Sequence, residues 1–226
     1  AHKMYAPFGT GVLIGPKSTF EKGEPEYSGG GTILAVSSDD IYWANPPDKD
    51  EAGTPNVIGA LALAESIKVL NEVGMNSVRK HEKELTKYML EKIYPIKGFK
   101  SYLSTNKKVL NDMVGVIPFN IEGFHHSFLS TVLSAEGAIG VRNGCFCAHP
   151  YIHSLLRLSA TDISNLQRDI LFGRMDKVPG LVRISFGIYN TKKEINEFVR
   201  VLKYIVDNKN SLEQKYKYTK NIYTLR

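Results

Sequence analysis

The sequence predicts an α/β protein whose C-terminal part is a compact α+β domain. Two adjoining segments of helical period lie between residues 57 and 92, and short apolar runs alternate with helical stretches from 95 to 210. The chain has 226 residues, of which 42% are hydrophobic and 23% charged. That length and composition suffice to bury a sizeable core.

The first 56 residues predict two short strands. The runs GVLIG at 11–15 and GGGTILAV at 29–36 are apolar and adjoin glycines, and the residues between them have the composition of a loop. Two helices follow, one from Asn56 to Gly74 and one over 76–92. In the first, apolar residues recur at helical spacing: Ile58, Leu61, Ala64, Ile67 and Leu70.

After Pro95 the pattern changes to short strands and helices. Apolar runs predict strands over 113–123, 138–144 and 180–187, and a short helix over 126–136. Pro118 lacks an N–H group and therefore favours an edge or a bulge of its sheet. The clearest helix begins with a capping box, Thr191 with Glu194. Its apolar stripe predicts a core-facing side: Ile195, Phe198, Val199, Leu202, Ile205 and Val206.

The net charge of +6 is concentrated at the C-terminal end. Residues 209–226 hold five basic residues against Glu213, a net charge of +4 (five minus one), with tyrosines between them: Lys209, Lys215, Lys217, Lys220 and Arg226. Such a tail can bind single-stranded nucleic acid by phosphate pairing and stacking. A solvated end whose tyrosines pack on the domain is commoner, so we expect no nucleic-acid partner. No apolar run reaches about 18 residues, so we expect no membrane span.

The two cysteines, Cys145 and Cys147, are one residue apart. Such a pair makes a poor structural disulfide, because alternate side chains of an extended chain point apart. The spacing favours free thiols in a reducing cytoplasm. With His149 they form a C-x-C-x-H pattern, but a zinc site needs a fourth ligand, so we expect no metal.

Other residues suggest chemistry only in combination. Lys3, next to His2, would alone be a solvated terminal charge. The turn from Gly29 to Thr32 can hold a phosphate through its N–H groups and hydroxyl. Arg183 lies in an apolar strand and needs a partner there, and a carboxylate held in a bidentate fork would serve.

Taken together, these motifs resemble the class V pyridoxal-phosphate aminotransferases, the group that contains the cysteine desulfurases and selenocysteine lyases. The segment Lys3-x5-Gly9-x-Gly11 resembles the family's cofactor lysine. The motifs GGGT, EAGTPN, VRNGCFCA and VRISFGIYNT follow in the family's order. The resemblance covers residues 1 to about 208. It implies the C-terminal portion of a fold-type I enzyme: the end of the cofactor-binding large domain (1–56), connecting helices (57–94) and the small domain with a basic tail (95–226).

The resemblance also implies roles for single residues. Lys3 would form the Schiff base with pyridoxal 5'-phosphate, beside His2, and Gly31 and Thr32 would reach the cofactor phosphate of a neighbouring subunit. The substrate carboxylate would be bound by two arginines, Arg183 and Arg142. Cys147 would attack the sulfur of cysteine, leaving a persulfide and releasing alanine. Cys145 has no assigned role: it would resolve the persulfide or only pack.

The same resemblance implies partners. We expect a homodimer with shared active sites, a cysteine-like amino-acid substrate and a sulfur-acceptor protein. The family's cofactor lysine lies at mid-chain, so we expect an N-terminal half upstream or on a separate chain. Without that half we expect the 226 residues to be inactive and to bind no cofactor.

One departure keeps other activities open. The stretch between Cys147 and Arg183 is long for a plain desulfurase and predicts an inserted helix followed by a loop. Another class V enzyme, whether an aminotransferase, a lyase or an epimerase, would share Lys3 and Arg183. Cys147 favours sulfur chemistry. The alternative from another class is a non-enzymatic α+β binding module that uses its basic tail or its C-x-C-x-H pattern.

Overall fold

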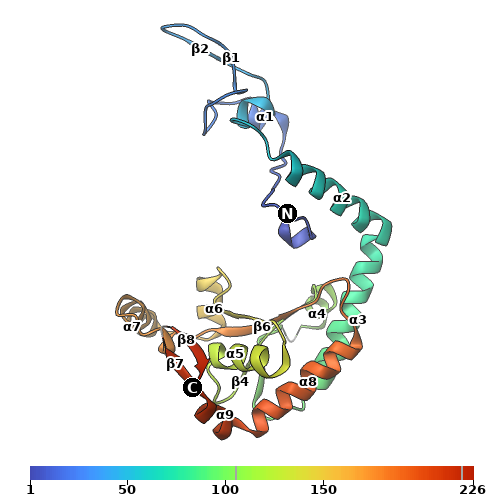
Figure 1. The fold of residues 1–226 in the computed structure, drawn as a ribbon, viewed down its shortest axis with the longest axis vertical. Helices are drawn as coiled ribbons and strands as arrows, with labels where there is room; N and C mark the ends of the chain where they lie inside the picture. The colour runs from blue at the N-terminus through green and yellow to red at the C-terminus, as the bar shows by residue number, and fades with distance from the viewer. Residues whose placement is uncertain (105, 220) are drawn as a thin grey trace. The chain divides into compact units, whose positions relative to one another are not determined.

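The computed structural model describes residues 1–104, 106–219 and 221–226. The chain divides into two compact units, Ala1–Met75 and Asn76–Arg226 (Figure 1). The predicted connecting segment 57–94 is shared between them, because its first helix belongs to the first unit and its second to the second. No helix among the described residues is long and apolar enough to cross a membrane.

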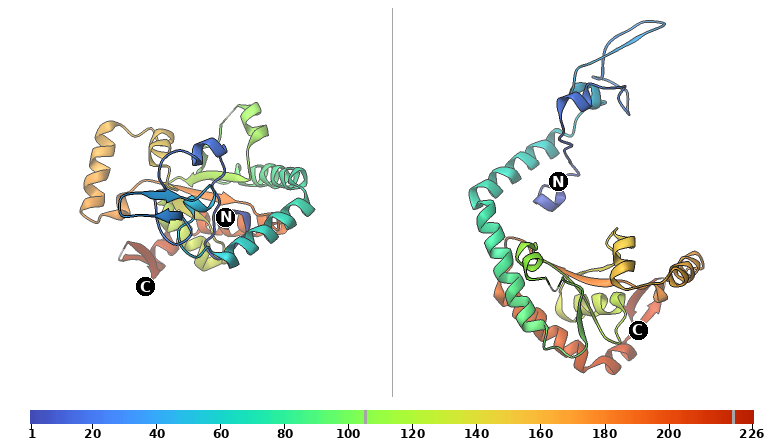
Figure 2. Two further views of the ribbon diagram at one scale, coloured as in Figure 1. Left: turned by 90° about the horizontal axis from the view of Figure 1, so that it is seen from above. Right: turned by 180° about the vertical axis from the view of Figure 1, so that it is seen from behind.

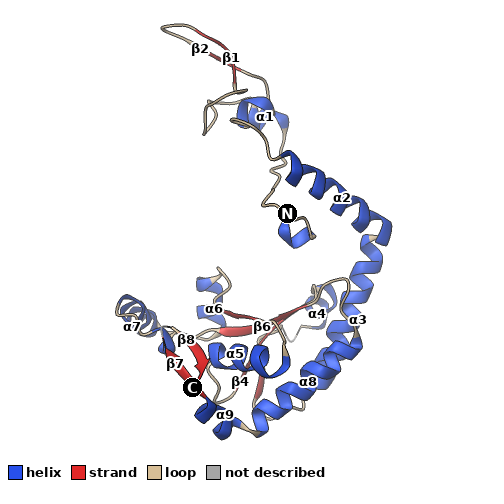
Figure 3. Ribbon diagram, viewed as in Figure 1, coloured by secondary structure: helices blue, strands red, loops and turns tan. Residues whose placement is uncertain are grey.

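The first unit is built largely from loops (Figure 3). It contains short helices η1 (His2–Met4), α1 (Lys17–Phe20) and η2 (Asp48–Asp50), a hairpin of β1 (Ile33–Val36) and β2 (Ile41–Trp43), and the long helix α2 (Val57–Val73). The strand predicted within 29–36 is confirmed over Ile33–Val36, after a turn, and the first predicted helix is confirmed as α2.

The strand predicted over 11–15 is wrong. These residues form no strand, and Val12, Leu13 and Ile14 are 67%, 84% and 88% exposed. Apolar composition alone does not make a strand, because a strand also needs a partner to bond its N–H and C=O groups. The hairpin β1–β2 is exposed along its length as well, apart from the half-buried Trp43. The first unit therefore presents much apolar surface.

The second unit is an antiparallel sheet with helices on both faces. Its strands are β3 (Phe99–Ser101), β4 (Val116–Ile121), β5 (Arg142–Gly144) and β6 (Leu181–Ser185), in the order β3-β4-β6-β5. All three pairings are antiparallel. This arrangement confirms the α+β prediction, although the predicted strand over 138–144 is reduced to three residues.

Three helices cover one face of this sheet: α3 (Met75–Ile93), α5 (His126–Gly137) and α8 (Lys192–Asp207). Together with Ile117, Phe119 and Val182 of the strands they enclose the main core. The short helix α6 (His149–Leu155) lies on the opposite face (Figures 1 and 2). There it buries a smaller apolar cluster that includes Cys145, Ile152 and Leu181.

Helix α8 forms as the sequence predicts. Thr191 and Glu194 make both hydrogen bonds of the capping box, and Ile195, Phe198 and Leu202 are among its buried residues. The two bonds satisfy N–H groups that the first turn of a helix leaves open.

The sequence predicts Pro118 at an edge or a bulge of its sheet. It lies instead on β4, which pairs with β3 on one side and β6 on the other. The strand tolerates it because β3 has ended at that level. The carbonyl of Pro118 accepts a hydrogen bond from Tyr102 N–H (3.1 Å) just beyond β3, and its nitrogen points to the same side. The donor that proline lacks is therefore missing only past the end of the β3–β4 ladder.

The insertion after Cys147 forms two helices rather than one, α6 and α7 (Ala160–Leu171), followed by the turn η3 (Met175–Lys177). Helix α4 (Lys107–Asp112) follows β3.

The basic tail is structured. It forms α9 (Lys209–Lys215) and a hairpin of β7 (Tyr216–Thr219) and β8 (Ile222–Leu225). Tyr216 and Tyr223 pack against Phe128 of α5, which agrees with the prediction that the tyrosines pack on the domain. Lys220 lies outside the described residues.

Candidate functional site

Lys3 lies in the first unit on η1, in a loop that is fastened to α2. The side chain of Ser66 donates to the carbonyl of Met4. Asn56, the N-cap of α2, donates to the carbonyl of Phe8 (2.7 Å). His2 and Lys3 are both exposed. The loop is thus held at both ends while the lysine amine stays accessible.

Gly59 allows this loop to lie close to α2. A Cβ atom at Gly59 would come within 2.5 Å of Asn56 Nδ2 and 2.8 Å of Thr10 Cβ, which is closer than real contacts. The loop that carries Lys3 therefore depends on a glycine in the first turn of a helix, where glycine otherwise lowers stability.

Gly31 and Thr32 lie in a tight turn of the same unit. The buried Thr32 hydroxyl donates to the carbonyl of Gly29 (2.8 Å) and accepts from Gly29 N–H (3.1 Å). Gly53 N–H binds the carbonyl of Gly30 (2.8 Å). The hydroxyl thus shapes the turn from within. Gly31 has a φ of +91°, which favours glycine at that position.

The two predicted substrate arginines face each other in the second unit. Arg142 on β5 lies directly opposite Arg183 on β6 in the antiparallel register. Opposed residues of such a pair project from the same face of the sheet. That face is the one covered by α6, because Val182 and Ile184, on either side of Arg183, are buried in the main core. Two like charges directly opposite are destabilising unless an anion lies between them.

Arg183 also has a buried donor without an acceptor. Its Nε makes no hydrogen bond within the described part of the chain. Its guanidinium lies over the ring of Phe146, 5.0 Å from the centroid. A buried donor of this kind calls for a missing acceptor, and a carboxylate would supply it.

Cys147 follows Phe146 on a strained turn. The N–H of Ala148 binds the carbonyl of Cys145 (2.8 Å), and the two central residues have positive φ angles, 53° for Phe146 and 59° for Cys147. This is the pattern of a type I′ turn, which glycine, asparagine and aspartate normally occupy. Each non-glycine residue in this conformation costs about 1–2 kcal/mol. Such strain is concentrated at functional sites.

The two thiols differ in their surroundings. Cys145 is buried, and its burial raises the pKa of the thiol above its ordinary value. Cys147 is exposed. A reactive thiol must meet its substrate and is therefore accessible, whereas a buried one is usually inert. The structure thus singles out Cys147 of the two.

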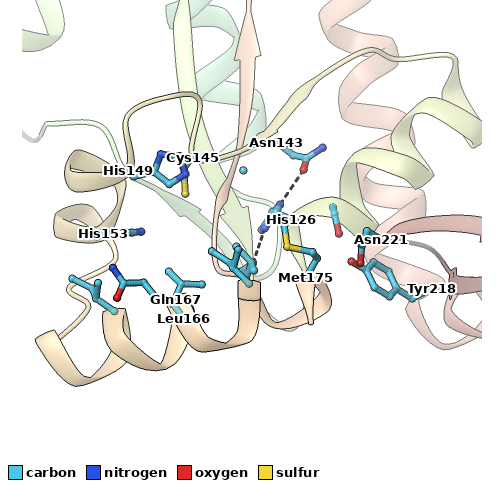
Figure 4. Close-up of a pocket in the computed structure, with 15 residues that line it drawn as sticks. His126, Asn143, Cys145, His149, His153, Leu166, Gln167, Met175, Tyr218 and Asn221 are labelled. Atoms are coloured by element: carbon cyan, nitrogen blue, oxygen red, sulfur yellow. Dashed lines mark hydrogen bonds between the residues drawn. The ribbon is translucent and has the colours of Figure 1, made fainter. Parts of the chain in front are cut away.

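A separate cavity of about 490 Å³ adjoins this turn (Figure 4). Cys145, His149 and His153 line it from one side, and His126 lines it from α5, bound to Asn143 (3.1 Å) and to the carbonyl of Val178 (2.9 Å). None of Arg142, Cys147 and Arg183 lines this cavity. The predicted substrate residues are therefore on the sheet face and the exposed turn, not in the cavity.

The structure brings three predicted site residues together in the second unit, Arg142, Arg183 and, through Phe146, Cys147. Lys3 and the Gly31–Thr32 turn belong to the first unit and are fastened to different parts of it. The prediction overlooked Phe146. Its position between two cysteines was the available signal, but a contact with an arginine 37 positions further on (183 minus 146) is set only by the fold.

The residues of the first unit fit pyridoxal phosphate in part. The amine of Lys3 is exposed and makes no hydrogen bond or ion pair among the residues described, so it is available for a carbonyl. The Gly29–Thr32 turn offers backbone around Gly30, where a Cβ atom would meet nothing within 4 Å. A phosphate can approach such a bare backbone closely.

Known proteins similar to this chain identify its family. The profile of the family Aminotransferase class-V matches residues 1–198. Probable cysteine desulfurases of Staphylococcus aureus (strain Mu50 / ATCC 700699) and Staphylococcus epidermidis (strain ATCC 12228 / FDA PCI 1200) are each 36% identical over 202 residues, which is 89% of this chain and 43% of theirs.

Solved structures give the same result. The cysteine desulfurase from Thermococcus onnurineus NA1 matches with a TM-score of 0.75 and 31% identity, over 91% of this chain and 45% of that one. The cysteine desulfurase CsdA from Escherichia coli matches with a TM-score of 0.74 and 28% identity, over 91% and 44%.

The chain thus spans less than half the length of the curated relatives it matches. Within that span the match includes both the lysine loop of the first unit and the arginine pair and cysteine turn of the second. The fold is that of the C-terminal portion of the fold-type I, pyridoxal-phosphate-dependent enzymes. The chain belongs to the class V aminotransferase family.

Proposed function

We propose that this chain is part of a pyridoxal-phosphate-dependent cysteine desulfurase, which removes sulfur from cysteine and releases alanine. One observation carries the proposal: the exposed thiol of Cys147 follows Phe146 on a strained turn, and the Phe146 ring contacts one of two opposed arginines. An aminotransferase or an epimerase needs the arginines but has no use for the thiol of Cys147. The names of the 36%-identical relatives support the same activity.

In this proposal Lys3 holds the cofactor through its amine, and His2 lies beside it. Gly31 binds the cofactor phosphate of a neighbouring subunit through its backbone, while Thr32 keeps the turn in shape. When bound, pyridoxal phosphate supplies an electron sink that weakens the bonds around the substrate Cα and Cβ atoms. Lys3 then carries the proton to and from the substrate Cα, because an amine is a base as well as a nucleophile.

The arginine pair binds the carboxylate of the substrate. The guanidinium of Arg183 donates in a bidentate fork, and Arg142 adds a second positive charge from the opposite strand. Occupation by a carboxylate also removes the repulsion between the two arginines. The carboxylate position is thereby fixed on the same sheet face as the turn that holds Cys147.

Cys147 accepts the sulfur. Its thiolate attacks the substrate sulfur, a sulfur–sulfur bond forms and the Cβ–S bond breaks. The electron pair left on Cβ takes up a proton and becomes the methyl group of alanine, so one thiol and one cysteine give one persulfide and one alanine. The exposed turn lets the persulfide reach an acceptor, which we propose is a protein thiol.

The exposed apolar surface of the first unit belongs to the same proposal. Val12, Leu13 and Ile14 and the hairpin β1–β2 would be costly to leave in water. We propose that the remainder of the large domain and a second subunit cover them in the working enzyme. The isolated 226 residues are then expected to be colourless and inactive.

The test uses the complete enzyme with L-cysteine and measures alanine. Cys147→Ser should abolish alanine formation, and the matched control Cys145→Ser should retain most of it. Borohydride should attach the cofactor to Lys3, as found by peptide mapping. Alanine formation that survives in Cys147→Ser would refute the desulfurase mechanism. Transamination or racemisation without any sulfide would instead support another class V activity.

A further inference from the structure

The contact between Arg183 and Phe146 joins two parts of the proposed site. Phe146 is the residue before Cys147, and its ring lies 5.0 Å from the Arg183 guanidinium. Both side chains are partly buried, and the Nε of Arg183 has no acceptor in the described part of the chain. A partly desolvated guanidinium over a ring is attracted by the negative face of the ring. The contact therefore restrains the position of the guanidinium.

The ring itself is held in place from below. Phe146 packs against the small cluster under α6, which contains Leu181 and Ile152. The backbone of Phe146 is in the left-handed region, with φ at 53°. Non-glycine residues rarely adopt this conformation, and it changes the direction in which the side chain projects from the turn. The surrounding packing must hold this conformation, because nothing in a phenylalanine favours it.

Because of Arg142, the guanidinium of Arg183 needs a group such as the Phe146 ring to hold it in place. Arg142 faces Arg183 across the two strands, and repulsion between the two guanidinium groups drives them apart. An arginine side chain has many rotamers, and ordering one on binding weakens the affinity of the site. A ring that holds Arg183 in the unliganded protein removes part of that cost.

We propose that Phe146 is a positioning residue for the carboxylate of the substrate. Its ring holds the guanidinium of Arg183 in the plane in which Nε and a terminal nitrogen can bind a carboxylate. The backbone of Phe146 forms the turn that holds Cys147, so one residue places both the carboxylate and the sulfur acceptor. This inference rests on the proposed function, since it assumes that Arg183 binds a carboxylate.

The experiment uses the complete enzyme, labelled with ¹⁵N at arginine, and propionate as the probe. Arginine Nε–Hε signals are followed by NMR during titration, with chloride at equal ionic strength as the control, and Arg183→Gln assigns the signal. In the unliganded protein the Arg183 Hε should be shifted upfield by the Phe146 ring. Propionate should move it downfield with a saturable curve that yields a Kd.

Three variants separate the possible roles of Phe146. Phe146→Tyr keeps the ring and should keep the Kd. Phe146→Leu keeps apolar packing, and Phe146→Asn suits the left-handed turn, but both lack a ring. Both should lose the upfield shift and weaken propionate binding by about threefold to tenfold. The complete enzyme should show the same factor in KM for L-cysteine and a smaller change in kcat.

Any other outcome of the titration refutes either the role of the Phe146 ring or the carboxylate role of Arg183. Unchanged affinity in Phe146→Leu would show that apolar packing suffices. Unchanged affinity in Phe146→Asn would show that only the turn conformation matters. Either result refutes the role of the ring and leaves the proposed function intact. If propionate does not move the Arg183 signal in the unmodified chain, the carboxylate role of Arg183 fails, and the inference fails with it.

Discussion

The contact that fastens the C-terminal hairpin to α5 gives a prediction whose size and pH dependence both follow from the structure. Glu136, near the end of α5, accepts hydrogen bonds at Oε1 from Lys215 Nζ (2.5 Å) and from the buried Tyr216 hydroxyl (2.7 Å). These bonds hold the pKa of the Glu136 carboxyl below its ordinary value. The informative substitution is Glu136→Gln, which keeps an acceptor oxygen and removes the charge.

The expected loss is modest because much of the contact survives. A hydrogen bond to a charged group contributes about 1.5–3 kcal/mol, and the amide oxygen of the Glu136→Gln variant would still accept a neutral bond from Tyr216 worth about 1 kcal/mol. The side chain of Lys215 is 49% exposed, so its ion pair contributes only about 0.2–1 kcal/mol. The sum is a loss of about 0.7–3 kcal/mol. For a unit of this size that is about 1–12 °C in Tm.

The loss depends on pH in a fixed direction. A carboxyl whose pKa is lower in the folded state stabilises the fold above its unfolded pKa of about 4.3. That contribution disappears as the pH falls through the lower, folded pKa. The difference between the unmodified chain and Glu136→Gln should therefore be full at pH 6–8 and shrink towards zero in acid.

The assay is urea unfolding followed by far-UV circular dichroism. The only tryptophan, Trp43, lies in the first unit, so its fluorescence would report on the wrong part. The matched control is Glu213→Gln, whose pair with Lys209 is long (3.7 Å) and half-exposed, and which should lose less than about 0.5 kcal/mol. Equal losses in the two variants at pH 7, or a difference that persists undiminished in acid, would refute the reasoning.

Three further substitutions test the packing that positions the site. Thr191→Ala removes the cap of α8 and should cost about 1 kcal/mol by urea unfolding, whereas Thr191→Ser should cost little. Leu202→Ala empties a fully buried position and should cost about 2–5 kcal/mol, with the exposed Lys203→Ala as control. Gly59→Ala pushes residues 1–10 away from α2 and should speed their amide exchange; unchanged exchange would contradict the close approach.

Much of the second unit could be predicted from sequence because its signals are local. The capping box of Thr191 and the apolar stripe of α8 lie in consecutive turns of one helix, and α3 follows the helical period, as does α2 of the first unit. The strand of Arg183 was also predictable. A charged residue between buried neighbours marks a place where the fold needs a partner for it.

What could not be predicted depends on contacts between distant segments. The interior position of Pro118 is possible only because β3 ends opposite it, which no local pattern reveals. The run at 11–15 has the composition of a strand but pairs with no strand among the described residues. The left-handed turn at Cys147 is equally hidden, because neither Phe146 nor Cys147 favours a positive φ.

Three features that lower stability lie close together in the proposed site, and their common position suggests that function retains them. Arg142 faces Arg183, a buried Nε lacks an acceptor among the described residues, and two consecutive non-glycine residues adopt positive φ. Each would be removed by a simple substitution if stability alone mattered. A carboxylate at the arginines would relieve the first two costs, and in the proposed mechanism the third belongs to the turn that presents the Cys147 thiol.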